Sequence, residues 1–213
     1  MDSKKYFQKF NQYIRPAKVY LSNLKKYFIF AAFFFVFSFV YGYAITQSAP
    51  SEAENIIKEL RNTYKPILDA GAFGQFLMIF MNNALVGFLT IVFGVVLGAF
   101  PLLVLFSNGM ILGILAFLTF HEFSVASFLI GILPHGIIEL PVMLVFVAIG
   151  LRMGHTVYYL ILKKIFPKNI KLIARDADIR RELSLAFRFF VKFLIPLLLL
   201  AAAIEVFITA ALL

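Results

Sequence analysis

The stretch Gln75–Phe106, QFLMIFMNNALVGFLTIVFGVVLGAFPLLVLF, decides the fold of this 213-residue chain. It contains no charged residue and is longer than the roughly 20 apolar residues that carry a helix across a bilayer. Comparable apolar runs recur along the chain, whereas most charged residues gather in three stretches between those runs. We therefore expect helices that cross a membrane, joined by polar segments.

The composition agrees with this interpretation. Apolar residues make up 62% of the chain and charged residues 15%, with a mean hydropathy of +0.92, whereas soluble domains have about 45–50% and 25%. A soluble enzyme, a disordered tail and a nucleic-acid-binding protein are excluded. The net charge of +9 comes from Lys and Arg placed where cytoplasmic loops are expected, so membrane lipids with anionic headgroups are the expected partner. The chain has no cysteine, hence no disulfide or zinc-thiolate site.

The predicted fold class is all-α, an integral membrane bundle of five transmembrane helices in a single domain, residues 1–213. The expected segments are a basic cytoplasmic arm (1–26), span 1 (27–45), an outer loop with a short amphipathic helix (46–74), span 2 (75–106), span 3 (110–133), span 4 (137–162), a basic cytoplasmic loop (163–192) and span 5 (193–213). In the outer loop, Ser51 and Glu54 have the spacing of a capping box, which predicts a helix that ends before Pro66.

Turns are expected where Gly, Pro and Asn cluster. Asn108 and Gly109 predict a turn after span 2, and Pro134 with Gly136 predicts the end of span 3, with Pro141 shortly after it. The polar residues around His121 leave two interpretations of residues 110–133: one full crossing with a polar break, or two half-length pieces.

Orientation follows from the Lys and Arg of the short loops. Seven precede span 1 and nine precede span 5, against three in the loop after span 1. The N-terminus and the last polar segment are therefore expected in the cytoplasm. An odd number of crossings must then separate the outer loop from residue 163, which makes 110–133 a true crossing. The prediction is a multi-pass protein of the cell membrane with its N-terminus inside and its C-terminus outside.

Counting depth along each span places a set of polar residues in the outer half of the bilayer. A charged side chain at the bilayer centre costs about 2.5–3.5 kcal/mol, so such residues should face the bundle and find partners. His135 and Glu139 are four residues apart and can share one helix face. Glu205 can meet an Asn of span 2, a histidine or a retained proton. The candidate functional cluster is Asn82, Asn83, His135, Glu139 and Glu205.

His121, Glu122 and Arg152 are secondary candidates. His121-Glu122 lacks the second histidine of a zincin helix, and the chain has no nucleophile elbow and no Walker loop. Imidazole and carboxylate groups of spans 3 and 4 can in principle gather a metal, but their spacing alone does not support one, so no metal and no cofactor are predicted. Arg152 is expected to snorkel or to form a structural pair. Three glycine pairs are expected to pack helices closely within the bundle: Gly94/Gly98, Gly109/Gly113 and Gly150/Gly154.

The run Pro134-His135-Gly136-Ile137-Ile138-Glu139-Leu140-Pro141 belongs to a larger pattern. With Asn82-Asn83, Asn108-Gly109, the segment Gly150–Gly154 and Glu205, it resembles the stage II sporulation protein M family over roughly residues 82–209. In spore-forming bacteria the resemblance implies a polytopic membrane protein that works with peptidoglycan-degrading partners during engulfment, as their membrane anchor. It implies no enzymatic activity for the wider family.

The sequence is consistent with three functions. The first is a non-enzymatic scaffold or assembly factor, favoured by the resemblance and by the missing catalytic motifs. The second is a small-solute or ion transporter, favoured by polar residues in several spans. The third is an intramembrane metal-dependent hydrolase. Expected partners are membrane lipids and, as candidates, a second copy of the chain in a homodimer or membrane and cell-envelope proteins, with no nucleic acid.

Overall fold

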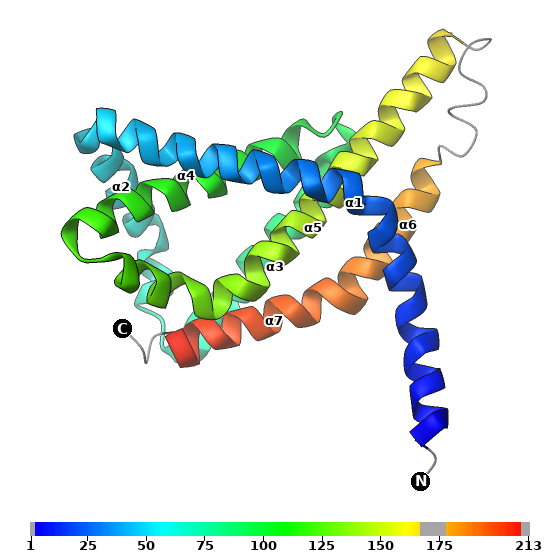
Figure 1. The fold of residues 1–213 in the computed structure, drawn as a ribbon, viewed down its shortest axis with the longest axis horizontal. Coiled ribbons are helices and arrows are strands. Elements are labelled where there is room, and N and C mark those ends of the chain that lie inside the picture. The colour runs from blue at the N-terminus through cyan, green and yellow to red at the C-terminus, as the bar shows by residue number, and fades with distance from the viewer. Residues whose placement is uncertain (1–2, 167–177, 210–213) are drawn as a thin grey trace.

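The computed structural model describes residues 3–166 and 178–209, apart from the side chains of residues 3–14, Leu68 and His135. Within these ranges the chain is helical and contains no strand. The helices are α1 (Ser3–Ser48), α2 (Pro50–Leu68), α3 (Ala72–Val92), η1 (Phe93–Val95), α4 (Ala99–Glu122), α5 (Val125–Ile165), α6 (Ile179–Phe189), η2 (Phe190–Leu194), α7 (Ile195–Ile204) and η3 (Glu205–Thr209). Their arrangement is drawn in Figure 1.

Five segments of the described chain are long and apolar enough to cross a membrane. They are Arg15–Ser48, Ala72–Val95, Ala99–Glu122, Gly136–Ile165 and Ile179–Thr209. Large apolar side chains such as Phe33, 74% exposed, and Leu103, 63% exposed, point away from the bundle, as expected where lipid replaces water. The prediction of an all-α membrane bundle with five spans is confirmed.

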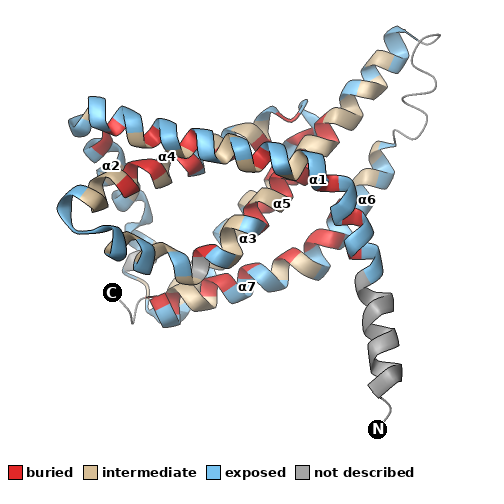
Figure 2. Cartoon of the chain, in the orientation of Figure 1, coloured by how far each residue is buried: buried red, intermediate tan, exposed pale blue. Residues whose placement is uncertain are grey.

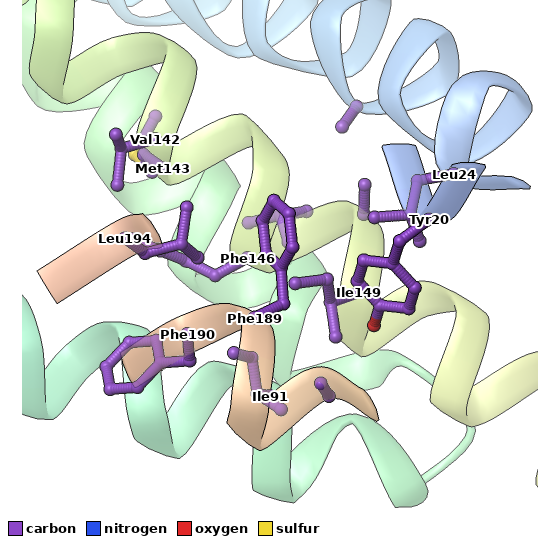
Figure 3. Close-up of a cluster of buried hydrophobic side chains, with 14 of the residues drawn as sticks. Tyr20, Leu24, Ile91, Val142, Met143, Phe146, Ile149, Phe189, Phe190 and Leu194 are labelled. Atoms are coloured by element: carbon purple, nitrogen blue, oxygen red, sulfur yellow. The ribbon is translucent and has the colours of Figure 1, made fainter. Parts of the chain in front are cut away.

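Helix α5 is the centre of the bundle. About 50% of its most apolar stretch is buried, against 17–28% for the other four spans, and Figure 2 shows buried residues along its middle. Phe146 and Ile149 of α5 pack with Ile91 of α3 and with Phe189 and Phe190 near the start of the last span, as Figure 3 shows. Tyr20 and Leu24 of α1 close the same cluster. The other four crossings therefore all pack against α5.

Helices α1 and α4 lie side by side (Figure 1), and at three glycines their backbones come into close contact. A Cβ at Gly113 would overlap the carbonyl oxygen of Phe39, and one at Gly42 would overlap that of Met110. A Cβ at Gly109 would lie 2.7 Å from the Cβ of Ser38. Only glycine permits this approach, so the glycines specify which faces meet.

The remaining predicted pairs pack α5 against the hairpin of α3 and α4. A Cβ at Gly150 would lie 2.6 Å from the carbonyl oxygen of Thr90. One at Gly94 would overlap Gly150, and one at Gly154 would overlap Gly98. The expectation that all three glycine pairs pack helices within one bundle is confirmed.

The predicted turn at Asn108 and Gly109 is wrong, because both residues lie inside α4. The chain turns earlier, where Leu97 has φ 51° and Gly98 has φ 78°. Asn108 donates its amide to the carbonyl oxygen of Val104 at 2.8 Å, as a helical residue can. Pro101 lies in the first turn of α4, where a backbone N–H has no intrahelical partner. Span 2 therefore ends before Gly98 instead of reaching 106.

The predicted span 3, 110–133, is also wrong in its bounds. Helix α4 ends at Glu122, and α5 begins after Ser124, whose Oγ accepts a hydrogen bond from the N–H of Ser127 at 3.1 Å. Pro134 and Pro141 lie inside α5 and do not end it. Proline removes one backbone hydrogen bond and bends a helix without necessarily stopping it, and α5 changes direction after its first turns in Figure 1. Residues 125–134 form a short apolar helix before the fourth crossing.

Two predicted polar segments contain more helix than expected. The first crossing and the described part of the arm form one helix, α1, with Pro16 inside it. The last crossing was expected at 193, but its helix begins at Ile179 and runs through the wide π-helical turn η2 into α7. Pro196 follows that turn and cannot donate a backbone hydrogen bond, which accounts for the local widening. Residues 167–177 of the predicted basic loop lie outside the described residues.

Helix α2 falls where the sequence predicts a short amphipathic helix. Pro66 lies in its last turn instead of marking its end. The helix begins without a side-chain cap, so the capping box expected from Ser51 and Glu54 is absent from this described segment. Its place outside the membrane stays a prediction.

Candidate functional site

Glu139 lies in the middle of the polar cluster. It extends from α5, half-buried, and its Oε1 accepts a hydrogen bond from the Nδ2 of Asn83 on α3 at 2.9 Å. A hydrogen bond in a poorly hydrated interior is electrostatically stronger than one in water. It therefore ties the second span to the fourth and leaves the second carboxyl oxygen of Glu139 for another partner.

Glu205 approaches the same place from the last span. It is half-buried at the first position of η3, and its carboxyl group interacts electrostatically with that of Glu139. Two carboxylates whose charges interact in a medium of low polarity repel each other, unless a proton or a cation neutralises one of them. The described part of the chain places no Lys or Arg in an ion pair with either group.

A small cavity adjoins Glu139 on the side of α4. Its volume is about 160 Å³, and Glu139 and Asn108 are its polar lining residues, with Phe35 of α1 and Gly136 of α5 among the apolar ones. Gly136 is one helical turn before Glu139, and its missing side chain leaves space there. An apolar groove of about 450 Å³ between α1 and α5 shares Phe35 and Gly136 with the cavity. Glu139 thus lies between the half-buried Asn83 amide and a cavity.

The remaining residues of the predicted cluster are placed differently. Asn82 lies on the exposed side of α3, so of the two neighbouring asparagines only Asn83 turns toward α5. The side chain of His135 lies outside the described residues, although its backbone is helical and the four-residue spacing to Glu139 holds. The Asn83 amide bonds Glu139, and the choice among the expected partners of Glu205 stays a prediction.

The secondary candidates His121 and Glu122 are exposed at the end of α4. The Nδ1 of His121 lies 2.7 Å from the carbonyl oxygen of Phe117, and its ring stacks on the Phe117 ring. Within the described side chains, no three His, Asp or Glu residues gather as metal ligands would. The hydrolase alternative therefore gains no support from the described residues.

A second polar cluster lies toward the other end of α5. Arg152 donates to Glu182 of α6 at 2.6 Å, and its guanidinium lies 5.9 Å from the ring centre of Tyr20. One turn later, His155 Nδ1 lies 2.5 Å from the hydroxyl oxygen of Tyr27. This cluster joins α1, α5 and α6.

The sequence predicted that Arg152 would snorkel or pair, but it did not identify the partner. The charge pattern of residues 163–192 predicts a loop, whereas Glu182 lies on the helix α6. Asp178 accepts hydrogen bonds from the N–H groups of Arg180 at 2.9 Å and Arg181 at 3.3 Å. An Asp followed by a Glu in the first turn is a helix start signal, and it could have placed Glu182 on a helix.

No curated protein matches the chain, and no solved structure matches it. The family model described as Stage II sporulation protein M matches residues 31–210. The matched range includes both polar clusters except Tyr20 and Tyr27, all six predicted glycines and the five crossings apart from the first part of α1. The chain is a multi-pass membrane protein, and it belongs to the stage II sporulation protein M family.

Proposed function

We propose that this protein is a non-enzymatic membrane scaffold or assembly factor. The observation that carries the proposal is the length of α1. Its 46 residues correspond to roughly 70 Å at 1.5 Å per residue, while a crossing uses about 20 residues. The first part of α1 leaves the bundle as a single helical arm, as Figure 1 shows. A helix that extends away from its bundle is suited to contact another protein, which supports the proposal.

The base of the arm is firmly joined to the bundle. Ala17, Tyr20 and Leu24 are buried against the core, and Arg152 contacts both the Tyr20 ring and Glu182. A helix held at its base by buried contacts has a defined direction, which favours a scaffold role over that of a flexible tether. The expected partners are membrane or cell-envelope proteins, or a second copy of the chain.

Photo-crosslinking in native membranes tests the scaffold. A photoreactive amino acid replaces Lys9 on the arm in one variant and Phe33 on the lipid-facing side of α1 in a control variant. We expect the arm position to crosslink to a discrete protein and the Phe33 position to crosslink to lipid. A crosslink of the arm to a second copy of the chain would identify a homodimer. Recovery of the protein alone from both positions would contradict the proposal.

A second candidate function, an ion or small-solute transporter, is favoured by one specific observation. Glu139 lies beside the Asn83 amide and a cavity, and its charge interacts with that of Glu205 on the last span. Intramembrane carboxyl groups often mark proton or ion pathways. Flux of protons, metal ions and small solutes into proteoliposomes tests this candidate. Glu139→Gln should abolish the flux, whereas the matched change of an exposed carboxylate, Glu122→Gln, should not. No flux across the screen removes the candidate.

A further inference from the structure

Two neighbouring cavities flank the contact between α1 and α6. The larger has a volume of about 660 Å³ and the smaller about 460 Å³. Pro16, Tyr20 and Leu185 line both, so the cavities lie on the two sides of one contact. Tyr20 is buried, and its ring centre lies 5.1 Å from that of Phe189; Figure 3 shows it at the edge of the core.

The larger cavity brings together two arginines from distant parts of the sequence. Arg15 of α1 and Arg181 of α6 line it, and both are exposed. Within the described chain the only ion pair is that of Arg152 with Glu182, so neither guanidinium meets a carboxylate there. Two guanidinium groups that line one cavity form a strong binding site for a phosphate, to which each can donate in a bidentate manner.

The smaller cavity is suited to hydrocarbon. Phe187, Val191 and Phe193 contribute apolar walls, with Arg188 among the basic residues that line it. Both cavities lie where a bilayer surface is expected, because the apolar part of α1 begins after Lys26 and that of the last span begins after Lys192. Anionic headgroups collect at such a basic surface, while acyl chains extend into the adjoining apolar space.

We infer that the α1–α6 contact is a binding site for one anionic phospholipid, with its phosphate between Arg15 and Arg181 and an acyl chain in the apolar cavity beside Leu185. The bound lipid joins the base of the arm to α6. This inference does not depend on a scaffold or transport function.

Native mass spectrometry of the full-length protein tests the site. The protein is titrated with dioleoylphosphatidylglycerol and, separately, with the zwitterionic dioleoylphosphatidylcholine. We expect one tightly held phosphatidylglycerol and weaker, multiple binding of phosphatidylcholine. Arg15→Gln and Arg181→Gln should each weaken the first phosphatidylglycerol about fivefold, since one basic residue at a membrane surface contributes roughly that factor. Phosphatidylcholine binding should not change.

Arg180→Gln is the matched control, because Arg180 is adjacent in sequence and exposed but lines neither cavity. Its binding should stay within twofold of the wild type. Equal losses in Arg180→Gln and Arg181→Gln would overturn the site in favour of diffuse surface charge, and no loss in either cavity variant would also overturn it. Inorganic phosphate at 10 mM should not displace the lipid, and displacement would show that the acyl chain is not bound. Arg181→Lys keeps the charge at this position. Its phosphatidylglycerol binding therefore shows whether the loss in Arg181→Gln comes from the missing charge or from misfolding.

Discussion

At the scale of single residues, the two polar clusters are built differently. Arg152 and Glu182 neutralise each other, with side chains only 20% and 12% exposed. Glu139 instead accepts a hydrogen bond from a neutral amide, and its charge interacts with that of a second carboxyl group, Glu205. The Arg152–Glu182 pair is neutral and needs no further ligand. Repulsion between the carboxyl groups of Glu139 and Glu205 favours binding of a proton or a cation. Substitutions should therefore lower stability at the first cluster more than at the second.

Arg152→Met should strongly destabilise the protein. The variant leaves the carboxylate of Glu182 partly desolvated and without its cation, and the cost of breaking such a pair is about 3 kcal/mol or more in free energy of unfolding. The double variant Arg152→Met with Glu182→Leu should recover much of this loss, since no charge remains to be buried. Thermal unfolding in one mild detergent measures both variants. A single variant that unfolds at the wild-type temperature would show that the pair contributes no stability.

Glu139→Gln should leave the unfolding temperature unchanged or raise it. A glutamine carbonyl can still accept the hydrogen bond from Asn83, and the repulsion with Glu205 disappears. Glu139→Leu removes the acceptor and should cost about 1–3 kcal/mol, because the Asn83 amide then lacks a partner in the membrane. The same unfolding measurement compares the two variants. If Glu139→Gln is as damaging as Glu139→Leu, the charge itself holds the bundle together, and the site is structural.

At the scale of helices, the sequence predicts five crossings correctly because apolar length is a strong and additive signal. It misplaces the turns because Gly, Pro and Asn occur both at turns and inside membrane helices. Gly109 predicts a turn, yet it lies within α4, where it allows close contact with Ser38 of α1. Pro134 predicts the end of a helix, yet it lies within α5. Which of Asn82 and Asn83 faces α5 depends on the rotation of α3, which is set by packing such as that of Gly87 on Phe146. No pattern in α3 alone contains that information.

Gly113→Ala should separate α1 from α4. The added methyl group would overlap the carbonyl oxygen of Phe39 and approach the backbone nitrogen of Tyr43 to 2.8 Å, and backbone cannot rotate away as a side chain can. We expect a loss of at least about 1–3 kcal/mol, the usual cost of overpacking. Gly131→Ala is the control, because nothing lies within 4 Å of a Cβ there.

In Gly131→Ala the better helix propensity of alanine should leave stability equal or higher by up to about 1 kcal/mol. Detergent unfolding curves of the two variants give the comparison. Equal effects of both substitutions would show that α1 and α4 do not pack as closely as their backbones indicate.

At the scale of the whole molecule, corrected boundaries preserve the predicted topology. The turn at Leu97–Gly98 replaces the one at Asn108, and the break at Phe123–Ser124 replaces the one at Pro134, so the number of crossings stays odd. This topology predicts that the basic arm and the start of helix α6 lie on one side of the membrane, opposite α2. Charge counts are robust to such shifts, because the Lys and Arg residues other than Arg152 lie in the polar segments that flank the predicted spans.

The orientation makes a direct prediction, and the chain suits its test because it contains no cysteine. Single cysteines replace Ser51 on α2, Ser184 on α6 and Val96 in the turn before α4, all exposed positions. The positive-inside rule places α2 outside and the other two positions inside. A membrane-impermeant maleimide should therefore label Ser51→Cys in intact cells, and label Ser184→Cys and Val96→Cys only after permeabilisation. Labelling of Ser184→Cys in intact cells would reverse the orientation, and opposite accessibility of Ser184→Cys and Val96→Cys would break the five-crossing topology itself.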